Sequence, residues 1–279
     1  MMKMLTVFFT LILIPLVAST SSAKTLVFSE EFSGPLNYST DCWDDIPDGS
    51  KWCVRDQIGG TGGSLGIGSC AMAANVTVEN GMAVITMRKE TQVCEGVSHQ
   101  WTSGELNTAF RFGFTHGYVE ARIKVPTGRG LYSAFWTYPK GWYAQVPEHD
   151  IFEAPLGDNP VFMTYHYNYG GERKMDQSEV TIPNFTDWHV WSLTWEPGLL
   201  IYKCDGVEYK RIEGATIPKT DELVGVFFTM YAGANWFNEY PDASTNLPQS
   251  MYIDWVRVWD SDMVQRVVPS PPSQVKILK

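Results

Sequence analysis

The chain has 279 residues, with 21 Lys and Arg against 31 Asp and Glu and a formal net charge of −10 at pH 7. This length can bury a large core in one domain, and the acidic balance argues against nucleic-acid binding, which requires a basic face. Aromatic residues make up 14% of the chain, including 11 Trp, which leaves some indoles for a flat ligand surface.

Residues 1–23 have the layout of a secretory signal peptide. Lys3 precedes a largely apolar run from Leu5 to Val17, and the small residues "ASTSSA" end at Ala23. The alternative is a membrane anchor, but about 20 apolar residues are usually needed to span a bilayer. We therefore expect cleavage near Ala23, secretion to the extracellular space, and no membrane span in the mature chain.

The five cysteines all follow this segment. In an exported protein we expect the first four to form one or two disulfide bonds, with three full pairings open. Their spacing lacks the paired short intervals of a zinc site. The fifth, Cys204, alternates in phase with Leu200 and Tyr202, which predicts a buried free thiol. The first four are Cys42, Cys53, Cys70 and Cys94.

Strand patterns dominate the rest of the chain, and no segment has the pattern of an amphipathic helix. In "YVEARIKV" (118–125), apolar residues alternate with charged ones, as in a strand with one wet face. The segment "IYKCDGVEYKRI" (201–212) is typical of a hairpin that turns at Asp205–Gly206. Further runs rich in aromatic and β-branched residues lie at 82–90, 189–196, 225–233 and 251–259.

Many strands without alternating helices predict an all-β fold of antiparallel sheets, either a sandwich or a closed barrel. The Gly-rich segment 55–71 is interpreted as a flexible loop, and it lacks the Lys-Ser/Thr ending of a phosphate cradle. The organisation expected is a signal peptide (1–23), one domain (24–260) and a loose, Pro-containing tail (261–279).

The stretch "VPEHDIFEAPLGD" (146–158) places Glu148, Asp150 and Glu153 within six positions. A calcium loop is disfavoured because Ile151 and Phe152 stand at the centre of the motif. A solvated strand face explains Glu148 and Asp150 but leaves Glu153 out of phase. One extra residue, a β-bulge at Ile151–Phe152, would return Glu153 to the face of the other two acids.

Two glutamates on one face with an aspartate between them suit retaining glycoside hydrolysis, which needs two carboxyls about 5–5.5 Å apart. Three close carboxyls do not all ionise cheaply, so protons are shared near neutral pH. One ionised nucleophile and one protonated acid are the division of labour that this reaction requires.

These motifs occur within a wider resemblance. Over nearly all of residues 26–259 the chain resembles glycoside hydrolase family 16, the laminarinase-like enzymes, and the resembling blocks stand in the family's order. The resemblance implies a β-jelly roll whose concave sheet forms an open cleft. The blocks are "LVFSEEFSG" (26–34), "TSGELNT" (102–108), "GYVEARIKVPTGRGLYSAFWTYP" (117–139), "PEHDIFEAPLGD" (147–158), "FTDWHVWSLTWEPGLLIYKCDG" (185–206) and "GANWFNEYPDASTNLPQSMYIDWVRVW" (233–259).

By position, the resemblance implies that Glu148 is the nucleophile, that Glu153 is the acid/base, and that Asp150 holds the nucleophile by a shared hydrogen bond. The bulged motif is the form seen in laminarinase-like and related galactan-cleaving members. No cofactor is expected for the chemistry. The resemblance also implies a structural calcium held by backbone carbonyls near the "EEF" block and by an aspartate, here Glu31, Gly34 and Asp254.

The same resemblance nominates residues for substrate binding. Trp136 is placed near the cleaved sugar, Trp142 and Trp236 are candidates for stacking on pyranose rings, and His166 follows the acids. A core position is the alternative for each Trp, and a structural role is the alternative for His166. Weaker polar candidates are Arg88, Asn107 and Asn235. We assign the other indoles of the strand runs mainly to the core: Trp188, Trp191, Trp195, Trp255 and Trp259.

Two residues depart from the family's pattern. His149 replaces an aliphatic residue on the side expected to face the core, so it is either a core histidine with a buried partner or a change that tunes Asp150. Glu105 stands where relatives often have a basic or small residue. As an extra acid near the cleft, it disfavours sulfated substrates.

The leading hypothesis is a secreted, monomeric, endo-acting hydrolase of a polysaccharide, with a β-1,3- or mixed-linkage glucan as the expected substrate. A non-catalytic β-glucan-recognition module of the same fold is one alternative, although this chain keeps both glutamates. A cell-wall transglycosylase is another, and sequence spacing does not show the acceptor subsites that would distinguish it.

Overall fold

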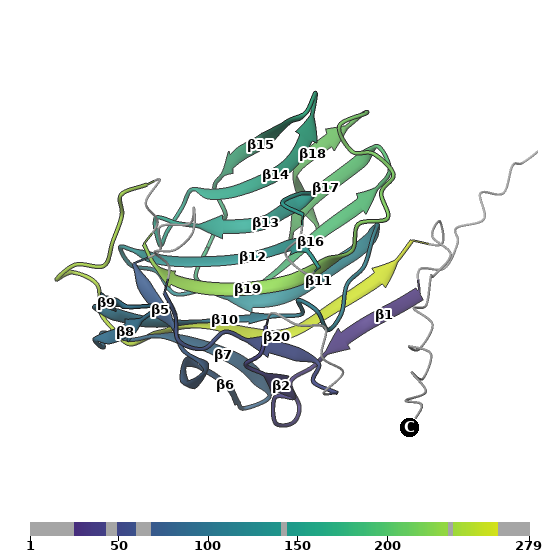
Figure 1. Ribbon diagram of the computed structural model, residues 1–279. Coiled ribbons are helices and arrows are strands. Elements are labelled where there is room, and N and C mark those ends of the chain that lie inside the picture. The colour runs from purple at the N-terminus through teal and green to yellow at the C-terminus, as the bar shows by residue number, and fades with distance from the viewer. Residues whose placement is uncertain (1–24, 43–48, 60–67, 141–143, 234–236, 262–279) are drawn as a thin grey trace, which may run out of the picture.

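The computed structural model describes residues 25–42, 49–59, 68–140, 144–233 and 237–261. Two large curved sheets lie face to face as a sandwich (Figure 1). Within the described residues there is no α-helix, and a single 3-10 turn spans Ala73–Asn75. The expected all-β jelly roll is confirmed.

One sheet, called the outer sheet, has eight strands in the order β18-β17-β16-β11-β20-β7-β6, with β1 paired to β20. Strand β11 has alternating buried and half-buried residues, so one face packs on the core and the other is wet. The bounds are β1 Thr25–Glu30, β6 Val76–Glu79, β7 Met82–Met87, β11 Gly117–Lys124, β16 His189–Glu196, β17 Leu199–Cys204, β18 Val207–Glu213 and β20 Gln249–Asp260.

The other sheet, called the cleft sheet, has ten strands in the order β15-β14-β13-β12-β19-β10-β3-β2, with β5 beside β10 and β4 beside β5. A separate small hairpin pairs β8 (Gln92–Cys94) with β9 (Val97–His99). The cleft-sheet bounds are β2 Tyr38–Ser39, β3 Trp52–Val54, β4 Ile58–Gly59, β5 Ser69–Ala71, β10 Trp101–Asn107, β12 Leu131–Pro139, β13 Glu148–Ala154, β14 Val161–Tyr169, β15 Glu172–Val180 and β19 Val224–Ala232.

The central strands of the cleft sheet are buried on both faces. Every residue of β19 is buried, and β12 is buried except at Tyr138. Their inner faces belong to the core between the sheets, to which Phe135 and Phe228 contribute a stacked ring pair with centroids 4.9 Å apart. Their outer faces form a second apolar cluster, which we call the cleft floor: Ala71, Ala109, Phe110, Tyr132, Ala134, Trp136, Phe227 and Tyr231.

The predicted strands are found within a few residues of their expected bounds, but two interpretations change. The expected 55–71 loop contains two short strands, β4 and β5, and its residues 60–67 lie outside the described part of the chain. Trp191 and Trp195 are buried in the core as expected. Three other indoles assigned to the core are instead half-buried, and guanidinium groups stack on two of them: Trp188, Trp255 and Trp259.

The cysteines pair in one of the three ways left open. Cys42 bonds to Cys53 and Cys70 to Cys94, while Cys204 is a buried free thiol as predicted. No helix within the described residues is long and apolar enough to cross a membrane. The predicted signal peptide and all of the tail beyond Ser261 lie outside the described residues.

Candidate active site

The three acids of the motif lie on one face because β13 carries a bulge. Toward β12, Phe152 lies opposite Phe135 and Asp150 opposite Trp136, so Ile151 is the extra residue. The register with β14 shifts at the same place, between Asp150 and Glu153. The predicted bulge at Ile151–Phe152 is therefore present. It buries both apolar side chains in the core and turns all three carboxyls to the opposite side.

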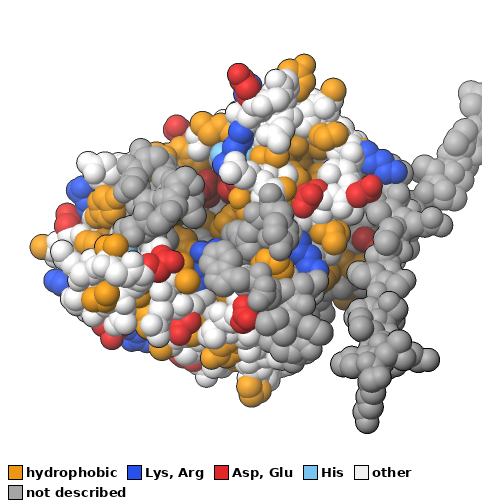
Figure 2. Space-filling model, viewed as in Figure 1, with side chains coloured by type: hydrophobic (Ala, Val, Ile, Leu, Met, Phe, Trp, Pro, Cys, Tyr) orange, Lys and Arg blue, Asp and Glu red, His pale blue; other side chains and the backbone are white. Residues whose placement is uncertain are grey.

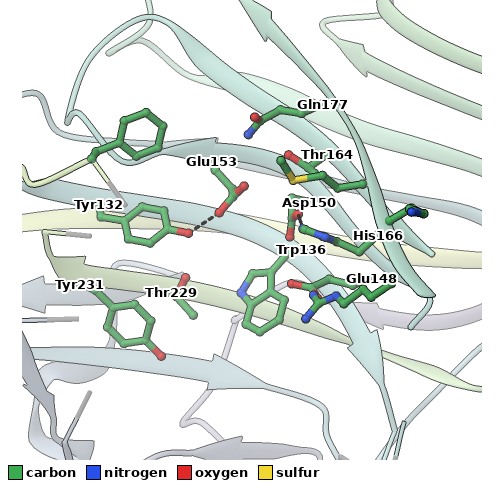
Figure 3. A pocket seen from close by; sticks show the side chains of 14 residues that line it. Tyr132, Trp136, Glu148, Asp150, Glu153, Thr164, His166, Gln177, Thr229 and Tyr231 are labelled. Atoms are coloured by element: carbon green, nitrogen blue, oxygen red, sulfur yellow. Dashed lines mark hydrogen bonds and ion pairs between the residues drawn. The ribbon is translucent and has the colours of Figure 1, made fainter. Parts of the chain in front are cut away.

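A cleft of about 510 Å³ opens over this face. Most of its lining comes from neighbouring strands of the cleft sheet. The three acids lie in a row along β13, and Trp136 lies beside them on β12 (Figure 3). The space-filling view shows Lys and Arg side chains scattered over this side of the molecule rather than gathered into a basic patch (Figure 2). The lining residues are Tyr132, Trp136, Glu148, Asp150, Glu153, Thr164, His166, Arg173, Lys174, Met175, Gln177, Thr229, Tyr231 and Phe237.

Each acid has a different neighbour. The Arg173 Nη2 donates to Glu148 Oε2 over 2.5 Å. Asp150 Oδ2 lies 3.3 Å from His166 Nε2. The Tyr132 hydroxyl donates to Glu153 Oε1 (Figure 3). The three acids therefore face a guanidinium, an imidazole and a phenol respectively.

Burial is the main influence on the protonation of these acids. It raises the pKa of Glu148, Asp150 and Glu153 above the ordinary carboxyl range, and to about 8 for Glu153. The Asp150 charge raises the pKa of both glutamates further, whereas His166 and Arg173 lower that of Glu148. The three carboxyls together therefore hold protons near neutral pH, as the sequence predicted for such a set.

Several cleft residues were absent from the sequence-based list. Tyr132 was hidden in an aromatic strand run, where an inward-facing and an outward-facing ring look alike. Arg173 and Gln177 lie on β15, whose sequence "ERKMDQSEV" is polar on both faces and gives no period-two apolar signal. Only the pairing of β15 with β14 brings these residues to the acids, and that register is a tertiary property.

Two of the proposed binding residues lie away from the cleft. Asn107 is fully buried, donates to Glu105 Oε1 over 2.8 Å and accepts from the Ala109 amide. Arg88 is exposed and donates to Asn75 Oδ1 over 3.1 Å. These bonds give each side chain a structural role instead. Trp136 and His166 do line the cleft, and the remaining candidates lie outside the described residues: Trp142, Asn235 and Trp236.

Glu105 does not add an open negative charge to the cleft, contrary to expectation. It is 1% exposed, and its Oε1 lies 3.0 Å from Arg55 Nε. The Tyr231 hydroxyl donates to its other oxygen. Because the charge of Glu105 is paired with the half-buried guanidinium of Arg55, the argument against sulfated substrates from this residue no longer holds.

His149 is a core histidine with a buried partner. Its Nδ1 lies 2.8 Å from Thr137 Oγ1, and its ring stacks on Tyr165 with centroids 5.2 Å apart. Trp195 packs on it at 4.7 Å. Burial lowers the pKa of His149 to about 3, so the ring is neutral at physiological pH. Its contacts assign it to packing between the sheets.

The side chains at the expected calcium position are paired with cations. Glu31 accepts two bonds from Arg257, and Asp254 Oδ2 accepts from Arg122 Nη1 over 2.6 Å. A calcium site needs several oxygen ligands free of competing cations. Asp254 is the one side-chain ligand expected at this position, and it already pairs with a guanidinium, so we derive no role for calcium.

Among the described residues, two other groups bring metal-ligand atoms within 4.8 Å of one another, and in each group an acid already pairs with a neighbouring side chain. In one, His189 Nδ1 lies 2.7 Å from Asp205 Oδ2, with Cys204 as the third member. The other is Glu148, Asp150 and His166 in the cleft, where Arg173 already pairs with Glu148. The second set is better explained as an acid/base site.

The chain has relatives among known proteins. A curated β-glucanase of Rhodothermus marinus is 29% identical over 260 residues, covering 84% of each chain. The glucan endo-1,3-β-glucosidase A1 of Niallia circulans is 28% identical over 181 residues, which are 57% of this chain but 26% of that protein. The chain thus spans about a quarter of the length of that relative.

Among solved structures, the catalytic domain of an endo-1,3-β-glucanase (laminarinase) from Thermotoga petrophila RKU-1 superposes with a TM-score of 0.69. The two are 26% identical, and the match covers 86% of this chain and 99% of that one. Residues 69–257, more than half of the chain, match the family described as glycosyl hydrolases family 16. The chain therefore belongs to glycosyl hydrolase family 16.

Proposed function

We propose that the protein is an endo-acting β-glycan hydrolase that works by retaining double displacement on a β-1,3- or mixed-linkage glucan. The observation that carries this proposal is the bulge in β13, which turns Glu148, Asp150 and Glu153 into one cleft. The relatives described above are named as glucanases, which supports the choice of substrate class.

In the first step, ionised Glu148 attacks the anomeric carbon while Glu153 gives its proton to the departing glycosidic oxygen. The carbon–oxygen bond to the leaving sugar breaks as the bond to Glu148 forms. In the second step, Glu153 takes a proton from water, which displaces Glu148 and restores both groups. Arg173 favours the ionised form of Glu148 at the start of this cycle.

The cleft floor gives the sugar chain an apolar surface. Trp136 packs against Phe227 with ring centroids 4.6 Å apart, and it lies beside the acids (Figure 3). Such a ring suits the apolar face of a pyranose. Endo cleavage requires a cleft that admits the middle of a polymer, and the lengths of the products test this property.

Two features support secretion as part of this proposal. The N-terminal segment has the layout of a cleaved signal, and two disulfides persist best in an oxidising compartment.

The test is hydrolysis of laminarin, lichenan, xyloglucan, agarose and carrageenan, with product lengths and the configuration of the newly formed anomeric centre followed by NMR. We expect β-configured oligosaccharides of intermediate length from laminarin or lichenan. Binding of glucan without cleavage would identify a recognition module instead. Products longer than the substrate would identify a transglycosylase.

The acids are tested by Glu148→Gln and Glu153→Gln. Each variant should lose at least about 1,000-fold in kcat on glucan, because each removes one of the two groups that the reaction needs, while glucan binding remains. Turnover near the wild-type rate in either variant would contradict the assignment.

A further inference from the structure

Tyr132 and Glu153 meet across two neighbouring strands of the cleft sheet. Glu153 lies opposite Ala134 of β12, and Tyr132 is two residues before Ala134, so it projects from the same face. Its hydroxyl donates to Glu153 Oε1 (Figure 3). Burial and the Glu153 charge raise the pKa of Tyr132 well above its ordinary value, so the phenol keeps its proton.

A second tyrosine lies beside the first but has a different acceptor. The rings of Tyr132 and Tyr231 are 6.4 Å apart and edge to face. The Tyr231 hydroxyl donates to Glu105, which also pairs with Arg55 and accepts a bond from Asn107. The Tyr231 hydroxyl therefore gives its hydrogen bond to Glu105. Of these two tyrosines, Tyr132 is the one that donates to Glu153.

The ring of Tyr132 has little freedom to leave this position. It is 7% exposed and packs within the cleft floor, beside Ala134 and Tyr231. A phenol held in this way offers a hydrogen bond at a fixed point, and the carboxyl of Glu153 must orient to meet it. Hydrogen bonds that involve an ionised partner are about twice as strong as neutral ones, so this contact strengthens when Glu153 loses its proton.

We propose that Tyr132 is a positioning residue for Glu153: it holds Oε1, so that the transferable proton sits on Oε2, and it stabilises the carboxylate that forms as the leaving sugar departs. The inference rests on the proposed function. During glycosylation the proton passes from Oε2 to the glycosidic oxygen, and during deglycosylation it returns from water to Oε2. Tyr132 keeps its own proton in both steps.

The test compares Tyr132→Phe with Tyr118→Phe. Tyr118 donates to Glu120 Oε2 over 2.9 Å on the outer sheet, so the control removes the same atom from the same kind of hydrogen bond away from the cleft. For Tyr132→Phe we expect kcat/KM on the glucan to fall at least about 10-fold. The basic limb of its pH profile should move to higher pH, because Glu153 loses a bond that favours its ionised form.

The leaving group separates positioning from a general loss of structure. In aryl β-glycosides with an acidic phenol, the leaving phenolate does not need a proton from Glu153. Tyr132→Phe should therefore change kcat/KM on these substrates less than 3-fold. An equal loss on both substrates with an unmoved basic limb would overturn the proposal, and so would wild-type values on both. Tyr118→Phe should match the wild type throughout.

A second variant keeps the ring and its packing. Replacement of Tyr132 by 3-fluorotyrosine makes the phenol a stronger donor, so the basic limb should move to lower pH, opposite to the phenylalanine variant. A shift in the same direction for both would contradict the proposal. If the wild-type protein cleaves none of the glycans, the proposed function fails, whereas an active wild type with unmoved limbs in both variants removes only the role of Tyr132.

Discussion

Arg173 reaches the cleft from β15 and pairs with Glu148, while Glu153 faces the neutral phenol of Tyr132. Burial raises the pKa of both glutamates. The Arg173 guanidinium lowers the pKa of Glu148 and does not act in this way on Glu153. Glu148 thus has a cationic neighbour that Glu153 lacks, while the Tyr132 hydroxyl and His166 lower the pKa of Glu153. In the proposed mechanism, the different roles of these two chemically identical side chains have to come from such differences between their neighbours.

Arg173→Gln tests this difference. Loss of the cation disfavours the ionised form of Glu148 and raises its pKa, so the acidic limb of the pH–rate profile should move to higher pH by about one unit or more. The rate at neutral pH should fall with it. Arg211→Gln is the control, because Arg211 pairs with Glu208 and Glu213 on the outer sheet. An acidic limb that stays in place would contradict the role of Arg173.

His149 makes stability depend on pH. Its native pKa is about 3, whereas an unfolded histidine has a pKa of about 6.5. Between these values the unfolded chain binds one more proton than the native one. The free energy of unfolding therefore decreases by about 1.4 kcal/mol for each pH unit below 6.5.

His149→Leu should remove this contribution. From pH 7 to pH 5, the free energy of unfolding should decrease by about 2 kcal/mol less in the variant than in the wild type. Urea denaturation at both pH values measures this decrease. The unpaired Thr137 hydroxyl lowers stability at both, so the difference between the two pH values is the informative quantity. Parallel losses in the two proteins would refute the assignment.

At the scale of elements, the β13 bulge lets one strand place apolar side chains in the core and carboxyls in the cleft without regular alternation. Ile151 and Phe152 both enter the core, and Glu153 still lies opposite Ala134 on the cleft side. A regular strand with the same six residues would send Glu153 into the core. The one added residue thus lets two consecutive side chains point into the core while all three acids stay on the cleft face.

Deletion of Ile151 should leave a regular strand with all three acids on the cleft face, because Glu153 then follows Asp150 by two positions. We expect measurable hydrolysis together with a stability loss of about 2–5 kcal/mol from the missing core side chain. Ile151→Ala is the matched control, which empties the same volume and keeps the bulge. Complete inactivity of a folded deletion variant would show that the bulge itself shapes the site.

The sequence predicts those elements whose side chains differ between faces. Strand β11 has a wet face and a core face, so its alternation is visible, and the misplaced phase of Glu153 indicates the bulge. Other contacts depend on register: Arg173 meets Glu148 only because β15 pairs with β14 in one alignment. Local spacing carries no information on that alignment, nor on which ring of a doubly buried strand faces the cleft.

At the scale of the whole molecule, the disulfides reinforce the end of the sandwich that has the shortest strands. Cys42–Cys53 closes 11 residues against β3, and Cys70–Cys94 closes 24 residues between β5 and the β8–β9 hairpin. Strands of two or three residues form few ladder bonds of their own, so these covalent links replace part of the missing pairing.

Reduction should therefore lower the free energy of unfolding by about 3 kcal/mol for each bond. The measurement is urea denaturation with and without a phosphine reductant, with Cys42→Ser/Cys53→Ser and Cys70→Ser/Cys94→Ser variants to separate the two. Insensitivity of the wild type to the reductant would contradict the expectation. Cys204 is buried and unpaired, so Cys204→Ala should leave the response to reductant unchanged.

Strand β15, which delivers Arg173, is also the last strand of the cleft sheet, with β14 as its partner on one side. Its other side presents main-chain donors and acceptors that a foreign strand can extend, and charged residues are the usual protection against this. Here Glu172, Arg173, Lys174 and Asp176 supply that protection. Substitutions that make β15 more apolar to suit a new substrate would therefore also favour pairing of this strand with the same strand of another copy.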